Sequence, residues 1–201
     1  MNRIEQILSF WFGELGSDGL PLEDRGKFWF RSDHETDERC SEFEQDLRNA
    51  ASGKLTDWGQ QPEGRLALIL LLDQFSRNIY RGTLQAFAQD PLALSLTSEG
   101  IGRGHDLMLR PIERVFFYMP LEHAESLEAQ ERCVAAHRAL LQAAPPASTP
   151  RLRSFLNHAI NHRDIIKRFG RFPHRNKLLN RTSTPEELQY LRTNKSTFGQ
   201  R

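Results

Sequence analysis

The feature that most constrains the fold is a spacing of apolar residues by three and four positions, without the alternation that strands require. The spacing is clearest near the C-terminus, where one helical face is formed by Leu152, Phe155, Ala159, His162, Ile166 and Phe169. Gly170 follows where such a helix usually ends, because glycine adopts the left-handed backbone of the C′ position without strain. This segment is therefore predicted to be a helix that ends at Gly170.

Similar start and stop signals predict helices along the rest of the chain. Thr184 and Glu187 have the spacing of a capping box, and Asp90-Pro91 has the order of a cap and a first-turn proline. Further helices are predicted over residues 4–11, 36–53, 63–80, 90–102, 111–120 and 126–144.

Two of these segments carry specific expectations about their ends. Ser32 and Glu35 have capping-box spacing before an apolar row that Gly53 ends. Pro111 is expected to start a short helix, and Pro120 is expected to end it, because proline cannot donate the backbone hydrogen bond of a helix interior.

About nine helices joined by short loops, with no alternating strand pattern, predict an all-α fold. Helices of modest length favour an array of antiparallel helical hairpins over a four-helix bundle. At 201 residues, the chain is expected to form a single all-helical domain over residues 1–201.

The composition argues against a membrane or secreted protein. The longest apolar run is the seven residues 66–72, whereas a membrane span needs roughly 20. The N-terminal segment contains Glu5 and Glu14 and resembles an amphipathic helix more than a signal peptide. Because Cys40 and Cys133 lie outside any CxxC motif, a reducing compartment is favoured and a cytoplasmic location is expected.

Charge is distributed unevenly along the chain, although the net charge is only +1. Residues 1–50 contain twelve acidic and six basic side chains, whereas residues 151–201 contain three acidic and twelve basic ones. Either the two ends neutralise each other in the folded protein, or the basic end binds an anion.

A polar patch ends the apolar segment 63–80. On a helix, Asp73 and Arg77 share a face, Arg81 extends that row, and Asn78 adds an amide beside it. In one interpretation, an ion pair anchors the helix end. In the other, Asp73 orients the arginines toward a ligand, because guanidinium groups suit carboxylate and phosphate oxygens.

A second polar group follows Pro120. If the helix ends there, a loop presents Glu122, His123 and Glu125. A carboxylate beside an imidazole is the smallest general acid and base pair. Glu122 and His123, with His174 further along the chain, are therefore candidate catalytic residues, and helix capping or inter-helix hydrogen bonding is the alternative.

The third polar group is the basic segment 162–176. Its candidate ligand-binding residues are His162, Arg171, Arg175 and Asn176. Gly170 turns the chain, and a new helix or turn near position 174 would add backbone donors for an anion. The alternatives are a core histidine at position 162 and neutralisation of the arginines by acids elsewhere in the chain.

No cofactor and no metal are expected. The sequence has no HExxH motif and no Glu-x-x-His pair, and the glycines at 100, 102 and 104 follow a predicted helix, unlike those of a dinucleotide loop. Nucleic-acid binding is disfavoured because the N-terminal third is acidic and few aromatic residues lie near the basic segment.

Three blocks of sequence resemble the hallmarks of a bacterial family named domain of unknown function 924. They are "DQFSRNIYRGTLQAFAQD", "ERVFFYMPLEHAES" and "HRDIIKRFGRFPHRN". The resemblance extends from "ILSFWFG" to "TSTPEELQYL", which is nearly the whole chain, although Ser76 stands where the family usually has proline. It implies a tetratricopeptide-like helical superhelix and no settled activity.

Because the three polar blocks are not needed for the fold alone, they are expected to meet in one cleft. The cleft is predicted to bind an anionic small molecule or an acidic peptide end through Arg77, Arg81, Arg171 and Arg175. The alternatives are an interaction scaffold that holds a protein partner, and a hydrolase or transferase that uses a His/Glu acid-base pair.

Overall fold

The computed structural model describes residues 1–30 and 34–194, and the regular structure in this part of the chain is helical apart from one bridge between Leu15 and Pro21. Its α-helices are α1 (Arg3–Phe12), α2 (Gly26–Phe30), α3 (His34–Ser41), α4 (Glu44–Ala51), α5 (Pro62–Ile69), α6 (Ser76–Ile79), α7 (Asp90–Gly102), α8 (Pro111–His123), α9 (Leu127–Ala143), α10 (Thr149–Phe169) and α11 (Pro185–Thr193). The shorter segments are the 3₁₀ turns η1 (Thr56–Gln60), η3 (Leu84–Phe87), η4 (His105–Met108) and η5 (Pro173–Arg175), and the π-helical segment η2 (Leu70–Phe75). The all-α class predicted from the sequence is confirmed, and the helix count is close to the expected nine.

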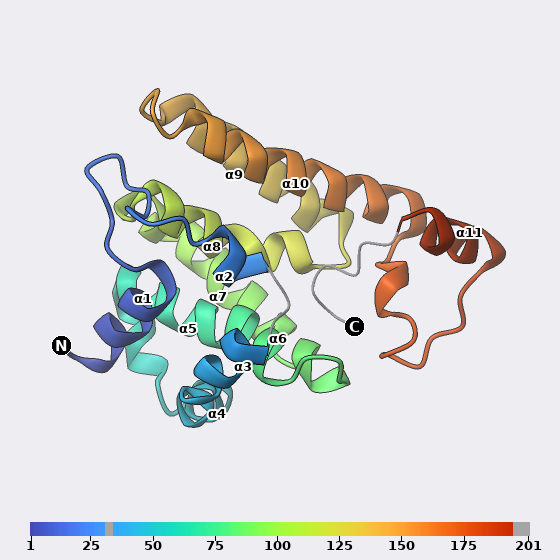
Figure 1. The fold of residues 1–201 in the computed structure, drawn as a ribbon, viewed down its shortest axis with the longest axis horizontal. Helices are drawn as coiled ribbons and strands as arrows, with labels where there is room; N and C mark the ends of the chain where they lie inside the picture. The colour runs from blue at the N-terminus through green and yellow to red at the C-terminus, as the bar shows by residue number, and fades with distance from the viewer. Residues whose placement is uncertain (31–33, 195–201) are drawn as a thin grey trace.

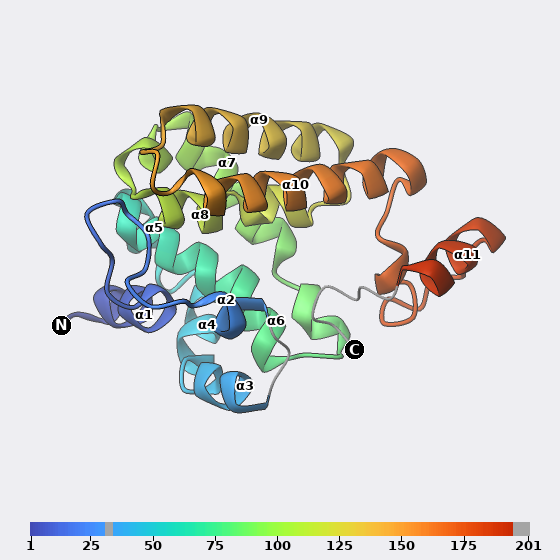
Figure 2. The ribbon, with the colours of Figure 1, turned by 45° about the horizontal axis from the view of Figure 1, so that its top comes forward.

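The helices are stacked in layers. The two longest, α9 and α10, lie side by side as an antiparallel pair (Figure 1, Figure 2). Helix α8 packs on α9 and α10, and also on α5 and α7. The short helices α1, α3 and α4 lie on the other side of α5, and α11 lies beyond the end of α10 (Figure 1). The hairpins α8–α9 and α9–α10 agree with the expected hairpin packing, whereas the tetratricopeptide-like superhelix is not confirmed. Among the described helices, none is long and apolar enough to cross a membrane.

An aromatic core joins the N-terminal helices to the centre of the molecule. The ring of Trp11 lies 5.3 Å from that of Phe75 and 5.6 Å from that of Phe116, measured between centroids. Trp29 contacts Phe116 at 4.8 Å in an edge-on geometry, which aromatic rings favour. These contacts hold α1 and α2 against α8 and against η2, the segment that carries Asp73.

The predicted central helix over residues 63–80 is a continuous helical run of α5, η2 and α6. Every residue from Gly64 to Ser76 is buried, as the apolar sequence predicts. Its middle turn is π-helical, and such wider turns occur often at functional sites. The run therefore carries Asp73 into the interior of the protein.

One side chain in this run, Arg65, is buried in the core although it carries a charge. It is 2% exposed and donates hydrogen bonds to the carbonyl oxygens of Gly59 and Leu96, at 2.6 and 3.0 Å. Helix α7 approaches closely at Gly100, where an added Cβ would lie 2.5 Å from both Arg65 Cδ and Phe117 Cζ.

The prediction that Pro120 ends its helix is wrong. Helix α8 continues to His123, and all residues from Val115 to Glu122 are buried. The proline removes one backbone hydrogen bond close to the helix end, and the burial of α8 among α5, α7, α9 and α10 outweighs that loss. Glu122 and His123 are consequently held on the last turn of a packed helix and not on a loop.

The single helix predicted over residues 36–53 is also wrong, because the chain breaks it into α3 and α4. At the break, the buried ring of Phe43 packs 4.8 Å from Phe10 and 5.1 Å from Phe75. Tertiary packing of an aromatic residue thus overrides the local helical pattern. The predicted cap Ser32 lies outside the described residues.

The predicted helix ends near the C-terminus are confirmed. Gly170 has φ +70°, and its N–H donates to the Ile166 carbonyl at 2.8 Å. At the start of α11, the N–H of Glu187 donates to Thr184 Oγ1 at 3.2 Å, and Glu187 Oε2 accepts from the Thr184 N–H at 2.8 Å. The ring of Phe172 is buried with Ile165 and Ile166 in a small second hydrophobic cluster, against which the partly buried Tyr190 of α11 also packs.

Candidate functional site

The structure brings residues from the three predicted blocks into one buried group, which we call the polar cluster. It consists of Asp73, Arg77, Asp90, His123 and Arg175. The five side chains come from η2, α6, the start of α7, the end of α8 and η5. Asp73 is fully buried, whereas the side chains of Asp90 and His123 are 20% and 16% exposed and form an edge that solvent reaches.

Asp73 is the centre of the polar cluster. Its Oδ1 lies 3.0 Å from a guanidinium nitrogen of Arg77 and 2.7 Å from His123 Nδ1, and its Oδ2 accepts a hydrogen bond from Gln74 Nε2 at 2.5 Å. Burial opposes ionisation, but Arg77 and His123 together hold the pKa of Asp73 below its usual range. A carboxylate only accepts hydrogen bonds, so His123 donates through Nδ1–H, and Nε2 is the acceptor nitrogen of the neutral ring.

Asp90 joins the two arginines of the polar cluster. It accepts a bidentate pair of hydrogen bonds from Arg77, at 2.9 and 3.0 Å. Arg175 donates to the same carboxylate at 3.4 Å, which is long for a charged hydrogen bond. One carboxylate group therefore serves two guanidinium groups.

Arg175 is the least satisfied member of the polar cluster. Its guanidinium lies between the rings of Phe87 and Phe172, 4.7 and 4.5 Å from their centroids. Its Nε is buried and has no hydrogen-bond partner among the described residues. Burial, and then the neighbouring charge of Arg77, lower the pKa of Arg175 to about 10.

Three more of the predicted residues, Glu122, His162 and His174, lie near the polar cluster. His162 Nδ1 lies 3.0 Å from Glu122 Oε1, and the ring of His162 is 6.4 Å from that of His123. The ring of His174 lies 5.5 Å from Phe172. Burial lowers the pKa of both His162 and His174 to about 3, and burial beside Asp73 raises the pKa of Glu122 to about 8. All three groups are consequently neutral at pH 7.

Two predicted ligand-binding residues, Asn78 and Arg81, lie outside the polar cluster. Arg81 is paired with Asp37, and Asn78 contacts Arg81. Arg81 makes two hydrogen bonds of 2.7 Å to the carboxylate of Asp37 on α3, and a third to Asn78 Oδ1 at 2.5 Å. The Asn78 amide donates to the Gln74 carbonyl at 3.0 Å. These contacts anchor the end of α6 to α3, as in the structural interpretation of this helix end.

Arg171 and Asn176 belong to a separate network at the start of α11. Arg171 makes hydrogen bonds of 2.6 and 2.8 Å to Glu187, and the Asn176 amide donates to the same carboxylate at 3.2 Å. The hydrogen bonds from Arg171 lower the pKa of Glu187 to about 2. Of the helix or turn predicted near position 174, the structure forms the 3₁₀ turn η5, and the N–H groups of Arg175 and Asn176 donate to the carbonyls of Phe172 and Pro173.

The acids that neutralise the basic C-terminal segment come from several elements. Arg181 makes hydrogen bonds of 2.6 and 2.9 Å to Glu125, which also accepts from the Phe172 N–H at 2.7 Å. Glu125 is therefore separated from the predicted pair of Glu122 and His123. A direct link between the acidic and basic ends is the ion pair of Arg151 with Asp24, at 2.9 Å.

Asp90 and Phe87 also belong to this site, although the sequence does not predict them there. Asp90 was predicted as a helix cap, but the residue at the N-cap position is Gln89, and the Asp90 carboxylate turns to the arginines instead. The sequence indicates them only through their place in the first of the three family blocks, which also contains Asp73. Their partners are distant in sequence, so no local spacing indicates them.

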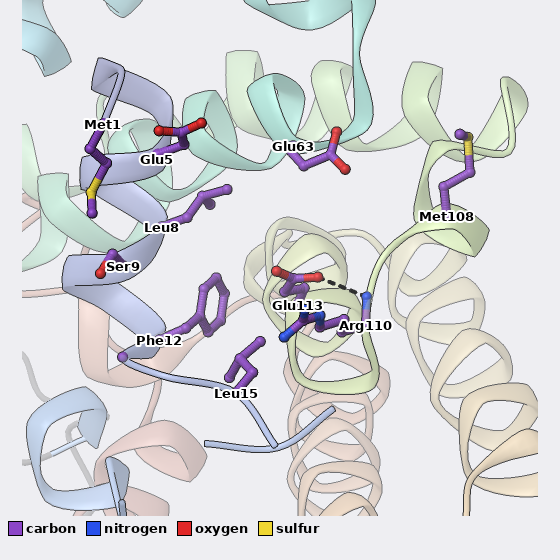
Figure 3. Close-up of a pocket in the computed structure, with 11 residues that line it drawn as sticks. Met1, Glu5, Leu8, Ser9, Phe12, Leu15, Glu63, Met108, Arg110 and Glu113 are labelled. Atoms are coloured by element: carbon purple, nitrogen blue, oxygen red, sulfur yellow. Dashed lines mark hydrogen bonds between the residues drawn. The ribbon is translucent and has the colours of Figure 1, made fainter. Parts of the chain in front are cut away.

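A surface pocket lies elsewhere, between α1 and the start of α8. It has a volume of about 450 Å³ and is lined by apolar side chains such as Phe12 and Met108, with Glu5 and Glu113 at its wall (Figure 3). Glu113 Oε2 accepts a hydrogen bond from the Arg110 N–H at 2.7 Å, so this carboxylate caps α8. The pocket contains none of the predicted site residues.

Fold and site together define an all-α protein with a buried, ion-paired cluster of arginine, aspartate and histidine. The chain belongs to the family described as bacterial protein of unknown function (DUF924), whose model matches residues 7–195. The structure is similar to the solved structure of ATU0120, a protein of unknown function from Agrobacterium tumefaciens, with 40% sequence identity and a TM-score of 0.78. That match covers 95% of this chain and 97% of the other. No curated protein matches the sequence.

Proposed function

We propose that the polar cluster binds an anionic small molecule at the edge where Asp90 and His123 reach solvent. The observation that carries the proposal is the state of Arg175. This guanidinium is buried between two phenyl rings, shares its carboxylate with Arg77, and has an Nε without a hydrogen-bond partner among the described residues.

Arg175 has more hydrogen-bond donors than acceptors within reach among the described residues. A guanidinium has five N–H donors, and a buried donor without an acceptor costs about 1–3 kcal/mol. Among the described residues, Arg175 donates one hydrogen bond, of 3.4 Å, to Asp90. A carboxylate or phosphate group would supply two or more acceptor oxygens in the planar arrangement that a guanidinium favours.

The charges of the polar cluster also favour an anionic ligand. Arg77 and Arg175 approach the single carboxylate of Asp90, and Asp73 is already paired with both Arg77 and His123. An additional negative charge beside Arg175 would be stabilised by the partly buried surroundings, where charges interact more strongly than in water. Arg81 and Arg171 are not part of this proposal, because each is paired with an acid outside the polar cluster.

Thermal unfolding of the purified protein tests the proposal. The probes are phosphate, nucleotides, dicarboxylates and tricarboxylates, and short acidic peptides with free or amidated C-termini. A ligand at 100 times its dissociation constant stabilises the native state by about 2.7 kcal/mol, which raises the melting temperature measurably. A response to free peptide ends alone would identify a peptide carboxylate, and a response to phosphate or small carboxylates would identify a small molecule.

Variants of Arg175 and Arg171 test whether the ligand that causes the thermal shift binds at Arg175. Arg175→Ala is expected to abolish the shift, and Arg175→Lys to weaken it, because lysine keeps the charge but loses the planar fork. Arg171→Ala removes a nearby arginine that is paired with Glu187, so it is expected to keep the ligand shift. If no probe stabilises the wild type, or if Arg171→Ala and Arg175→Ala lose the shift equally, the proposal is wrong.

The Asp73–His123 pair favours a second candidate function, acid-base catalysis on the bound anion. The 2.7 Å hydrogen bond fixes the imidazole and leaves Nε2 as an acceptor, as in enzymes where a carboxylate orients a histidine base. A hydrolase or transferase reaction would use this nitrogen, with the arginines stabilising negative charge in the transition state. The test is a screen of phosphoesters, esters and amides, in which any turnover must be lost in His123→Ala. Turnover that survives this substitution would exclude the mechanism.

The proposed setting is the cytoplasm, where a reducing environment suits the two buried free cysteines, Cys40 and Cys133. A fusion protein located by fractionation of bacterial cells tests this, and recovery in the periplasm would contradict it.

A further inference from the structure

A second buried group lies where the end of α8 packs on α9. Glu122, Cys133 and His137 each place one potential ligand atom within 4.8 Å of the others. Their relative exposures are 6%, 0% and 2%. Among residues 1–30 and 34–194, no other three His, Cys, Asp or Glu side chains are close enough to share an ion. We propose that these three residues bind a divalent transition-metal ion of the zinc type.

An unsatisfied imidazole supports this site independently of the clustering. His137 Nε2 is buried and has no hydrogen-bond partner among the described residues. Native proteins leave few buried polar atoms in this state, and binding of an ion would satisfy this one. A neutral imidazole nitrogen is the commonest metal ligand in proteins.

The donor set matches a borderline-soft divalent ion. Zinc binds thiolate sulfur, imidazole nitrogen and carboxylate oxygen, and sites with three protein ligands retain a fourth position for water or substrate. Cys133 and Glu122 would each release a proton when the ion binds, and their two negative charges would then balance the charge of the ion, so the filled site would add no net charge to the protein interior. Metal bonds of about 2.0–2.3 Å require ligand atoms to lie within about 4 Å of one another. The present spacing therefore needs a contraction of less than about 1 Å.

The scaffold around the site is suited to hold such ligands. Cys133 and His137 lie four residues apart on α9, so they share the buried face of one helix. Glu122 comes from the adjacent last turn of α8, and His162 Nδ1 lies 3.0 Å from its carboxylate. The same Nδ1 lies 2.9 Å from the His158 carbonyl oxygen, so the ring of His162 is held beside the Glu122 carboxylate. Because the third ligand comes from another helix, no linear motif in the sequence indicates the site.

Cobalt(II) titration of the untagged, chelator-treated protein tests the proposal. Cobalt replaces zinc in such sites and reports a thiolate ligand by a sulfur-to-cobalt charge-transfer band in the near ultraviolet. We expect the band to appear, to saturate at equimolar cobalt, and to disappear when zinc is added. Zinc is also expected to raise the melting temperature of the protein. If excess cobalt produces no charge-transfer band, the proposal is wrong.

The two cysteines provide a matched control. Cys133→Ser is expected to lose the charge-transfer band, and Cys40→Ser to keep it, because Cys40 is equally buried but belongs to no such group. His137→Gln is expected to weaken cobalt binding at least tenfold, and circular dichroism confirms that each variant is folded. A band that depends on Cys40 and not on Cys133 would overturn the assignment. The site does not include Arg175, so its failure is separate from failure of the anion proposal.

Discussion

Replacing Asp90 by asparagine tests whether the two buried arginines depend on one carboxylate. Asp90 accepts two hydrogen bonds from Arg77, at 2.9 and 3.0 Å, and one from Arg175 at 3.4 Å. Removing one partner of a buried ion pair costs about 3–5 kcal/mol, because the other charge is left uncompensated. The Asp90 side chain is 20% exposed and asparagine still accepts a hydrogen bond, so we expect the low end, about 3 kcal/mol.

The assay is thermal and urea-induced unfolding followed by circular dichroism. For a chain of this size, 1 kcal/mol lowers the melting temperature by about 2–4 °C, so Asp90→Asn is expected to lower it by about 6–12 °C. The control is Asp24→Asn, which removes an ion pair of similar length with Arg151 but at a side chain that is 70% exposed. We expect this surface variant to melt close to the wild type. A decrease below about 2 °C for Asp90→Asn would refute the reasoning.

The same substitution separates a stabilising role of Asp90 from competition with a ligand. If an anion binds beside Arg175, removing the negative charge of Asp90 removes a repulsion of the ligand and leaves Arg77 and Arg175 less neutralised. Asp90→Asn is therefore expected to be less stable without ligand, yet to show a larger thermal shift with the anion that stabilises the wild type. A smaller ligand shift in the variant would contradict the anion site even if the loss of stability is confirmed.

Three further predictions concern the fold. Gly100→Ala is expected to destabilise the protein by about 1–3 kcal/mol in urea unfolding, because its Cβ would collide with Arg65 and Phe117. Arg65→Met is expected to cost about 3 kcal/mol in the same assay, because the buried carbonyl of Gly59 and the partly buried carbonyl of Leu96 lose their donor. Glu187 has a pKa lowered to about 2 by Arg171, so its stabilising effect is complete above pH 4.5, the value of the unfolded chain, and is lost as the pH falls toward 2. The melting temperature of the wild type should consequently fall more steeply over that range than that of Glu187→Gln, and parallel curves would contradict this.

The helix ends that were predicted correctly are those whose signals lie within one turn. Gly170 needs a left-handed backbone regardless of what surrounds it, and Thr184 and Glu187 cap α11 through atoms three residues apart. The incorrect ends depend on packing. Whether α8 passes Pro120, or the chain turns at Phe43, is decided by burial against helices that are remote in sequence.

The same distinction applies to the candidate site. The pair of Asp73 and Arg77 could be predicted from their four-residue spacing, and the structure confirms the contact at 3.0 Å. For Arg81 and Arg171, the sequence indicates a charge that needs a partner but does not indicate which acid supplies it. The acid that pairs with each arginine depends on which helices become neighbours. The fold places α3 beside Arg81 and α11 beside Arg171.

The polar cluster is difficult to explain as a stabilising device. Buried ion pairs can often be replaced by apolar side chains of similar volume with no loss of stability, because desolvation offsets much of the attraction between the charges. The surrounding elements η2, α7 and α8 already supply a continuous apolar core, so leucine or methionine at these positions would meet the needs of packing. Instead, four chain segments converge to bury two arginines around one shared carboxylate, and one of these arginines has an unsatisfied donor. This buried guanidinium has more donors than acceptors among the described residues, and that imbalance is the observation on which the proposed anion site rests.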